Sequence, residues 1–420
     1  MIKLTNGQAE GLANIAEFLK SDDPCYLLTG KPGTGKTFLL SEVPGLVKYG
    51  TVIGCGPTHK AVEVLATRLP EIECCTIHRF LGLRPKRTKD KTVLTRRNDY
   101  DPSSNMDVRV VLMDESSMNG TEITAYILED IKTWGRQYIF VGDRHQLPPV
   151  NEVSSPCFNL DFGRWRTHLT EIVRQAADNP IIQAAGLIQD AIEAGKAPEI
   201  TPGQSDTGVV QILSKQKWRE KLAEYVLAPG GNDGYRILAY RNAVVREYNQ
   251  LVRETLGLDL AVPFTVGESV VVNEAFCQNE EVIFNTGEEY TVTDMQPLTH
   301  MTYPTLTGWS VKLSANGIQI PQSVAVLDDD KCGTEYKRVT DALIEHGRKH
   351  NDWRGYYRLV ETFCDIRPLY AMTCHKSQGS TFDNVFLDVG DVYTNRNKLE
   401  ADYCLNVGMT RARFNVYVRM

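Results

Sequence analysis

The sequence predicts an α/β protein with doubly wound parallel sheets, and three segments carry this prediction. An apolar run ends in a glycine-rich loop and a helix start at residues 26–40, and two more apolar runs end in polar residues at 108–118 and 137–150. Buried parallel strands read as continuous apolar runs, and ligands bind at the carboxyl ends of such strands. Together the three segments predict a nucleoside triphosphatase core.

The segment "YLLTGKPGTGKTFLL", residues 26–40, has the strand, loop and helix order that a phosphate-binding loop requires. Glycines let backbone N–H groups close around phosphates without Cβ clashes, and the following helix N-terminus favours negative charge. Lys36 is predicted to reach the β- and γ-phosphates, and Thr37 to bind Mg²⁺. The residues predicted to bind nucleotide in this segment are Gly30, Gly33, Thr34, Gly35, Lys36 and Thr37.

The two later strands place polar side chains at the same sheet edge. Asp114 and Glu115 follow "VRVVLM", where an aspartate can hold Mg²⁺ and a glutamate can polarise the attacking water. Gln146 in "VGDRHQLPPV" is predicted to hydrogen-bond a γ-phosphate or its attacking water. We therefore assign Lys36, Asp114, Glu115 and Gln146 to catalysis, with Thr37 and Asp114 as metal ligands.

Composition places the chain among ordinary globular proteins. Its 420 residues are 42% hydrophobic and 24% charged, which predicts two or three domains. The N-terminal stretch has no signal-peptide core, and no segment reaches the ~18 apolar residues needed to span a membrane. Ten cysteines without a CxxC pair predict reduced thiols in the cytoplasm.

One segment is strongly basic although the whole chain has a net charge of −7. Residues 84–97, "RPKRTKDKTVLTRR", carry seven basic residues and one acid. A solvated basic loop and a phosphate-facing hairpin both fit this run. The overall acidity does not exclude nucleic acid, because binding depends on a local groove.

At this point a family resemblance becomes specific. The order "GKPGTGKT", "GPTHKAV", "TIHRFLG", "MDESSM", "VGDRHQLPPV", "LTEIVRQ", then "TCHKSQGSTFDNVFL" and "LNVGMTRARFNVYV", resembles superfamily 1 helicases of the RecD-like (1B) branch. The match runs from "LTNGQ" to residue 418, and the size and plan are similar to the bacteriophage Dda-like group. The resemblance implies two RecA-like P-loop lobes, with ATP and Mg²⁺ as cofactors.

The resemblance adds further nucleotide contacts. It implies that Gln8 reads the adenine edge, and that Gln378 and Gly379 turn toward the nucleotide. It also implies that Arg174 contacts the γ-phosphate and that Arg411 of "GMTRAR" is an arginine finger from the second lobe. A guanidinium suits this task because its planar fork stabilises spread phosphoryl charge.

Two polar loops are implied to hold a nucleic acid strand. Such contacts go to backbone and sugar, and so position a strand without reading its sequence. The first lobe supplies Pro57, Thr58, His59, Lys60 and His78, with Thr76 and Arg79 beside them, and the second supplies Thr373, His375, Lys376 and Ser377.

The resemblance also implies a domain plan. Residues 1–175 form the first lobe, with a pin-like β-hairpin at 83–107, and the second lobe comprises 176–262 and 366–420. Residues 263–365 form an insertion of short β-like runs, which suggests an SH3-like barrel, followed by helical sequence. Tyr100 is the only aromatic in the hairpin segment, so the wedge residue is open.

The predicted function is an ATP-dependent DNA helicase that moves on single strands and opens duplexes. The resemblance implies 5′→3′ travel, single-stranded and tailed duplex DNA as partners, and a single-strand-binding or replication protein as a further partner. It implies no membrane association, and a host cytoplasm if the chain is phage-encoded. An RNA helicase of the same superfamily and a nucleotide-gated clamp without processive movement are the alternatives.

Overall fold

The computed structural model describes residues 4–87, 92–149, 152–173, 178–228, 234–278 and 281–420. The chain forms two compact units, one made of residues 1–245 and 372–420 and the other of residues 246–371. Within the described ranges, no helix has the length and apolarity needed to cross a membrane. All ten cysteines are free thiols, as their spacing predicted.

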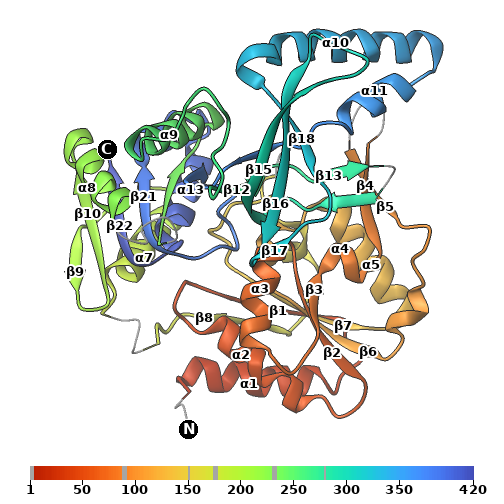
Figure 1. The fold of residues 1–420 in the computed structure, drawn as a ribbon. Coiled ribbons are helices and arrows are strands. Elements are labelled where there is room, and N and C mark those ends of the chain that lie inside the picture. The colour runs from red at the N-terminus through yellow and green to blue at the C-terminus, as the bar shows by residue number, and fades with distance from the viewer. Residues whose placement is uncertain (1–3, 88–91, 150–151, 174–177, 229–233, 279–280) are drawn as a thin grey trace. The chain divides into compact units, whose positions relative to one another are not determined.

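The first unit contains a parallel six-stranded sheet built from residues 25–169 (Figure 1). Each neighbouring pair of strands in it is parallel. In spatial order the strands are β3 (Cys74–Thr76), β2 (Thr51–Gly56), β6 (Val108–Met113), β7 (Gln137–Gly142), β1 (Cys25–Gly30) and β8 (Arg166–Leu169). The three strands predicted from apolar runs are β1, β6 and β7, which lie next to one another.

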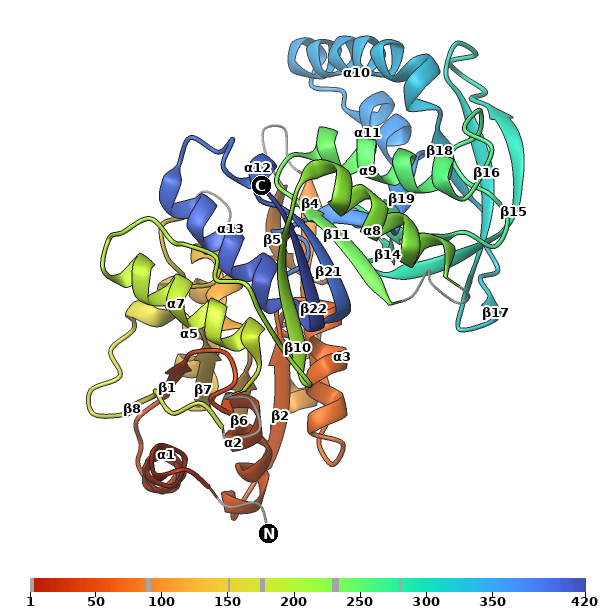
Figure 2. The same ribbon diagram turned by 90° about the vertical axis from the view of Figure 1, so that its left-hand side faces the viewer.

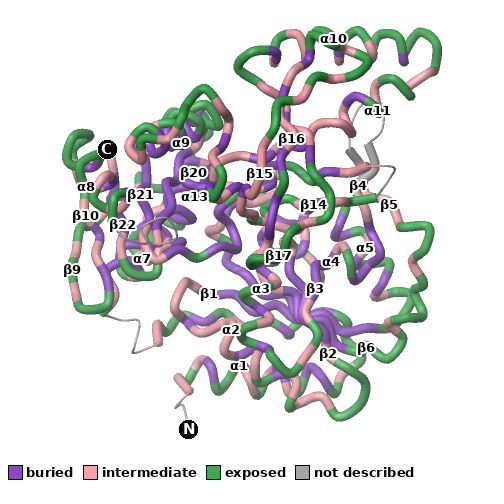
Figure 3. Tube along the Cα trace, viewed as in Figure 1, coloured by how far each residue is buried: buried purple, intermediate pink, exposed green. Residues whose placement is uncertain are grey.

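Side chains of this sheet alternate between two apolar cores. Tyr26 and Leu28 pack with the helices α1 (Asn6–Phe18), α2 (Lys36–Glu42) and α3 (His59–Arg68). Cys25 and Leu27 pack on the opposite face, with α4 (Ile77–Phe80) and α5 (Thr121–Trp134). Burial on both faces explains why these strands read as unbroken apolar runs, and Figure 3 shows them as buried.

A second six-stranded sheet belongs to the same unit. Its central strands pair in parallel, and the edge strand at Gly203–Ser205 is antiparallel to its neighbour. In spatial order the strands are β20 (Ala371–Thr373), β11 (Tyr235–Ala239), β21 (Phe382–Asp388), β22 (Ala412–Arg419), β10 (Gly208–Leu213) and β9 (Gly203–Ser205). The helices α7 (Pro180–Glu193) and α13 (Lys398–Thr410) pack against each other beside this sheet (Figure 2), while α8 (Lys215–Leu227) contacts β10 and β22.

The predicted hairpin in the first lobe is present. The strands β4 (Leu83–Arg87) and β5 (Thr92–Arg96) pair antiparallel, and residues 88–91 between them lie outside the described residues. Tyr100 packs over Gly82 at the base of the hairpin, and its hydroxyl donates to the carbonyl of Phe80 at 2.9 Å. This packing makes Tyr100 a structural residue of the hairpin base rather than its tip.

The second unit holds the predicted small barrel. Strands β12 (Ser269–Val272), β15 (Glu289–Thr299), β16 (Thr307–Ala315) and β18 (Val324–Leu327) pair in series, and β19 (Ile366–Pro368) pairs with β12. A bridge between Ala325 and Phe363, just before β19, closes the circuit. The remaining strands are β13 (Phe276–Gln278), β14 (Glu281–Phe284) and β17 (Ile318–Gln319).

The helical sequence after the barrel strands forms α10 (Asp329–His350) and α11 (Arg354–Val360). Trp353 lies against Gly347, where an added Cβ would come within 2.8 Å of the indole ring, and its ring contacts Tyr356. The His346 and His350 rings lie 4.6 Å apart. The described residues contain no group of three or more His, Cys, Asp or Glu side chains that could hold a metal ion.

This unit is wider than the predicted insertion at 263–365. The second half of α9 (Asn242–Thr255) packs with it: Arg253 pairs with Glu268 at 3.1 Å and donates to the carbonyl of Val262. Asn249 accepts a hydrogen bond from the backbone N–H of Ala371. These long side chains tie the helix to the inserted residues, and nothing in the helix's local sequence indicates that.

Candidate functional site

The loop between β1 and α2 has the backbone geometry of a phosphate cradle. Gly33 and Gly35 have φ of 78° and 82°, values that L side chains rarely adopt. A Cβ on Gly30 would come within 2.7 Å of the Leu169 carbonyl oxygen, so the sheet itself excludes a larger residue there. The predicted glycines are therefore required by conformation and by space.

Lys36 begins α2 and folds back over the loop. Its ammonium donates to the carbonyl oxygens of Gly30 at 2.6 Å and Lys31 at 3.1 Å. The Thr34 hydroxyl also donates to the Lys31 carbonyl, at 2.8 Å. Thr37 lies in the same first turn of α2. The cationic group is thus held over the mouth of the cradle, where phosphates would replace the carbonyls as its partners.

Gln8 is tied to this loop from the first helix. Its side-chain oxygen accepts the Thr5 N–H at 3.1 Å in a capping box, and its amide nitrogen donates to the Thr34 carbonyl at 2.9 Å. The side chain is buried and lies so close to Gly35 that a Cβ there would come within 2.3 Å of its nitrogen. Gln8 therefore braces the loop, and its predicted role toward adenine stays a prediction.

Asp114 and Glu115 leave β6 at the same edge of the sheet. The Asp114 N–H donates to the Cys55 carbonyl, and the Asp114 carboxylate accepts the Glu115 N–H at 2.9 Å. Glu115 has a left-handed backbone, with φ of 49°. Burial and the Glu115 charge raise the pKa of Asp114 to about 7, against the lowering effect of Lys36.

This acidic pair fits a divalent cation. Two carboxylates lie together, and their mutual repulsion, together with burial, disfavours ionisation of Asp114. A Mg²⁺ ion prefers oxygen ligands and would offset that repulsion. Asp114 and the Thr37 hydroxyl are the groups that would hold it, where it would neutralise phosphate charge.

The turn after β7 carries Gln146 and a residue that the sequence reasoning missed. The side-chain oxygen of Gln146 is buried and has no hydrogen-bond partner, which fits a residue aimed at a polar ligand. Asp143 is 2% exposed, and its carboxylate accepts the His145 N–H at 2.9 Å and the Gln189 amide at 2.8 Å. Burial raises the pKa of Asp143, but the His145 hydrogen bonds and the Lys36 charge outweigh it and lower the pKa below its usual value.

Arg411 brings a cation from the second sheet to this edge. It is 6% exposed, and its guanidinium donates to the Ser380 carbonyl at 3.2 Å, while its Nε has no partner. Burial lowers the pKa of Arg411, and the charges of Glu115 and Asp143 act in the opposite direction. Arg411 is thus electrostatically coupled to two carboxylates at the ends of β6 and β7.

By contrast, Arg413 is about 60% exposed and pairs with Asp383 at 3.1 Å. Arg413 is therefore not part of the buried polar group around Arg411. Arg174 lies outside the described residues.

Further contacts join the two sheets near the loop. The Gln378 amide donates to the Leu147 carbonyl at 3.1 Å, and the Asn406 amide donates to the His145 carbonyl at 2.9 Å. Gly379 has φ of 76°, and a Cβ there would come within 3.3 Å of the Thr58 hydroxyl. Gln378 and Gly379 therefore lie at the junction of the two sheets, with Gln378 next to the first-lobe turn that bears Gln146.

The first predicted strand-binding loop surrounds two helix starts. Thr58 and Thr76 cap α3 and α4, each accepting a backbone N–H at 3.2 Å. Burial and the charge of His59 lower the pKa of His78. His59 is exposed, and Lys60 pairs with Glu63 at 3.0 Å. Pro57 lies between Gly56 and Thr58 and is half-buried.

The second loop divides into exposed and buried residues. Lys376 is exposed, and His375 pairs with Glu400 at 3.2 Å. Ser377 is fully buried, and its hydroxyl donates to the Cys374 carbonyl at 2.8 Å. Thr373 is also buried, and its hydroxyl accepts the Lys376 N–H. In this arrangement Thr373 and Ser377 shape the loop that presents Lys376.

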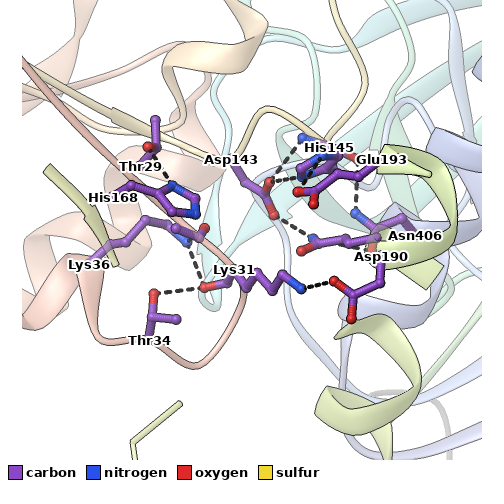
Figure 4. A network of polar contacts seen from close by, with 12 residues as sticks. Thr29, Lys31, Thr34, Lys36, Asp143, His145, His168, Asp190, Glu193 and Asn406 are labelled. Atoms are coloured by element: carbon purple, nitrogen blue, oxygen red, sulfur yellow. Dashed lines mark hydrogen bonds and ion pairs between the residues drawn. The ribbon is translucent and has the colours of Figure 1, made fainter. Parts of the chain in front are cut away.

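The residues missed by sequence reasoning form a polar network around Asp143 (Figure 4). Four of them come from α7 and α13, where Gln, Asp, Glu and Asn look like ordinary helix surface, and the others come from the loops after β1 and β7. The one available signal was the acid and histidine in "GDRH", directly after a buried strand. The members are Lys31, Asp143, His145, Gln189, Asp190, Glu193 and Asn406.

Known families match both sheets. A family model described as an AAA domain matches residues 3–214, and one described as a UvrD-like helicase C-terminal domain matches residues 368–418. The chain is 24% identical over 448 residues to the ATP-dependent DNA helicase dda of Enterobacteria phage T4, covering 99% of this chain and 98% of that protein. It is 35% identical over 202 residues to the ATP-dependent RecD2 DNA helicase of Deinococcus radiodurans, covering 47% of this chain and 25% of that protein.

Solved structures share the fold. A structure of two coordinating Pif1 helicases at forked dsDNA has a TM-score of 0.54 and 17% identity, covering 99% of this chain and 92% of that chain. A Bacteroides Pif1 helicase in complex with ADP-AlF3 and ssDNA has a TM-score of 0.50 and 16% identity, with the same coverage.

Proposed function

The chain belongs to the AAA-domain family as a superfamily 1 helicase of the Dda, Pif1 and RecD type, and on this premise we propose that it couples ATP hydrolysis to 5′→3′ movement along single-stranded DNA. The protein is an ATP-dependent DNA helicase. Movement along one strand while the other is displaced would unwind a tailed duplex. The direction is inferred from the family branch.

The observation that carries this proposal is the position of Arg411. A second-sheet arginine is buried within electrostatic reach of Glu115 and Asp143, at the edge that holds the phosphate loop. Hydrolysis therefore depends on how the two sheets meet. A site assembled in this way can convert nucleotide state into relative movement of two lobes.

Each group has a role in this scheme. Lys36 would bind the β- and γ-phosphates, Thr37 and Asp114 would hold Mg²⁺, and Glu115 would orient the attacking water. Gln146 would sense the γ-phosphate, with Arg411 and Arg174 stabilising charge on the transferring group. Gln8, Gln378 and Gly379 would complete the nucleotide site.

DNA grip is assigned to the two polar loops. His59, Lys60 and His78 on the first lobe and His375 and Lys376 on the second are proposed to contact the strand. Alternating grip between the loops would advance the strand as the lobes close and open. Opening one base-pair step costs about 1.4 kcal/mol on average, so the hairpin β4–β5 needs only to block re-annealing.

The direct test uses duplexes with a single-stranded tail at either the 5′ or the 3′ end, together with ATP and Mg²⁺. We expect release of the strand only from the 5′-tailed duplex. Release only from the 3′-tailed duplex would reverse the assigned direction. ATPase stimulation by single strands without strand release would instead indicate a nucleotide-gated clamp, and preference for RNA tails would indicate an RNA helicase.

We place the activity in the cytoplasm, which would be the host cytoplasm if the chain is phage-encoded. A single-strand-binding or replication protein is the proposed protein partner. Strand release measured with and without a single-strand-binding protein tests that part, with faster release expected in its presence.

A further inference from the structure

One face of the second-lobe helix α7 contacts three positions of the first lobe. Gln189 donates to the Asp143 carboxylate, and Glu193 pairs with the His145 ring at 3.2 Å. Between them, Asp190 forms an ion pair with Lys31 (Figure 4). α7 itself packs against α13, β10 and β22, so these contacts join the second sheet to the first.

Lys31 belongs to the phosphate loop. Its carbonyl oxygen accepts hydrogen bonds from the Lys36 ammonium at 3.1 Å and the Thr34 hydroxyl at 2.8 Å. The loop that would hold the phosphates therefore carries a second ammonium besides that of Lys36. The nucleotide scheme above does not use it.

The three α7 contacts differ in how easily they can be exchanged. Gln189 and Asp143 are both buried, so breaking their hydrogen bond would leave two buried polar groups without this partner and without access to water. The Lys31 and Asp190 side chains are 22% and 60% exposed, and exposed ion pairs contribute little net free energy. A triphosphate carries several negative charges and can compete with one exposed carboxylate for the same cation.

We propose that Lys31 is a nucleotide-contacting residue that Asp190 holds in the absence of nucleotide, and that phosphates and Asp190 compete for its ammonium. The inference rests on the proposed ATP site. Binding of nucleotide would release one contact between α7 and the first lobe, while the buried Gln189–Asp143 contact persists. α7 would thereby report phosphate occupancy to the second sheet.

Competition predicts opposite effects from removing the two partners. In Lys31→Gln the phosphates lose a cation, so nucleotide should bind about 3- to 5-fold more weakly. In Asp190→Asn the cation is released to the phosphates, so nucleotide should bind about 2- to 4-fold more tightly. In the double variant, affinity should equal that of Lys31→Gln alone, because Asp190 acts through Lys31.

The experiment is an equilibrium titration of the full chain with a fluorescent, non-hydrolysable ATP analogue and Mg²⁺, without DNA. Glu193→Gln is the matched control, because it removes an acid from the same helix face without touching Lys31, and its affinity should be unchanged. Circular dichroism spectra and melting curves verify that each variant is folded.

Two outcomes would overturn the proposal. Unchanged affinity in Lys31→Gln would show that its ammonium does not meet the phosphates. If Asp190→Asn still tightened nucleotide binding in the Lys31→Gln background, the effect would not act through Lys31. If Glu193→Gln tightened binding equally, the effect would come from the negative charge of α7 in general and not from competition for the Lys31 ammonium. The titration measures nucleotide binding and not strand release. A failure of the proposed helicase activity in the tailed-duplex test can therefore be told apart from a failure of this inference.

Discussion

The two parallel sheets have the same connectivity but only one of them builds a phosphate loop. Without the edge strands β8 and β9, the order β3-β2-β6-β7-β1 matches β20-β11-β21-β22-β10 strand for strand. β1 corresponds to β10, and each is followed by a helix. The strand order is therefore repeated in the second sheet, while the phosphate loop is not.

The difference lies in the connection after that strand. In the first sheet, residues 31–35 separate β1 from α2 and include two glycines with positive φ. In the second sheet, only Ser214 separates β10 from α8, and its hydroxyl accepts the Lys217 N–H at the helix start. The start of α2 has no side-chain cap, whereas Ser214 caps the start of α8. From the second lobe, Gln378 and Arg411 are instead proposed to contribute to the nucleotide site.

The largest effect should come from removing the second sheet's arginine. Arg411→Ala should lower ATP turnover by about 10³-fold or more, because arginine fingers contribute about 10³–10⁵. Nucleotide binding should persist, since the phosphate loop is intact. Steady-state ATPase and equilibrium titration measure the two quantities.

Arg413→Ala is the matched control for that arginine. It removes an exposed, ion-paired arginine two residues away and should leave turnover close to the wild-type value. Near-normal ATPase activity in Arg411→Ala would contradict the proposed contribution of the second lobe, because that lobe would then supply no cation essential for hydrolysis.

The next effect concerns the acids of the first sheet. Asp114→Asn should lose ATPase by about 10²-fold or more, because Mg²⁺ and its phosphate neutralisation depend on this carboxylate. The same variant should be more stable than the wild type at pH 8 without Mg²⁺. The gain should be at most about 4 kcal/mol, since the pKa is raised from 3.8 to about 7 and one pKa unit corresponds to about 1.4 kcal/mol.

The sign follows from the raised pKa of Asp114, about 7 in the folded chain. Between about pH 4 and pH 7 the folded chain holds a proton that the unfolded chain has lost, so wild-type stability falls as pH rises through this window. Asp114→Asn removes that dependence, and the two proteins should converge near pH 4. Melting curves at several pH values test this, with the exposed Asp22→Asn as control. If the stability difference between Asp114→Asn and the wild type were no larger at pH 8 than at pH 4, this prediction would be contradicted.

A smaller effect is expected from the loop backbone. Gly35→Ala places a Cβ at φ of 82° and within 2.3 Å of the Gln8 amide nitrogen, which must give up its bond to Thr34. Strain on the order of 1–2 kcal/mol corresponds to about 10-fold weaker ATP binding. Gly45→Ala is the control, because an added Cβ there meets no atom within 4 Å. Equal nucleotide affinity in the two variants would argue against a preformed cradle.

The smallest effect should come from the corresponding connection in the second sheet. Ser214→Ala removes the cap of α8 and should lower the free energy of unfolding by about 1 kcal/mol. ATP affinity should not change, because this connection holds no phosphate. Urea denaturation and nucleotide titration provide the two measurements. Weaker ATP binding in Ser214→Ala would mean that the second sheet also contacts nucleotide.

The parts of the site that the sequence predicted are those made by contiguous residues. A glycine loop between a buried strand and a helix determines its own backbone geometry, so Gly33, Gly35 and Lys36 were identifiable in advance. Asp114 and Gln146 were identifiable because parallel strands end at a common edge. The barrel was predicted from short β-like runs, but its closure through Phe363 required a contact between segments distant in the chain.

Other features had no local signal. Tyr100 is the one aromatic residue in the hairpin segment, but it lies at the base of the hairpin. Its ring packs over Gly82 because that glycine has no Cβ to occupy the space. Gln189, Asp190 and Glu193 read as the polar face of an amphipathic helix, which is normally solvated. Only the packing of α7 turns that face toward the phosphate loop.

The sequence by itself predicted where the groups proposed for phosphate, metal and sensor roles arise, because each depends on a few neighbouring residues and on the end of one buried strand. The tertiary structure alone decided which second-lobe groups are coupled to them: Arg411 feels the charges of Glu115 and Asp143, and Asp190 forms an ion pair with Lys31. Those pairings are separated by more than a hundred residues, and their free energy depends on burial and distance, which local sequence does not encode.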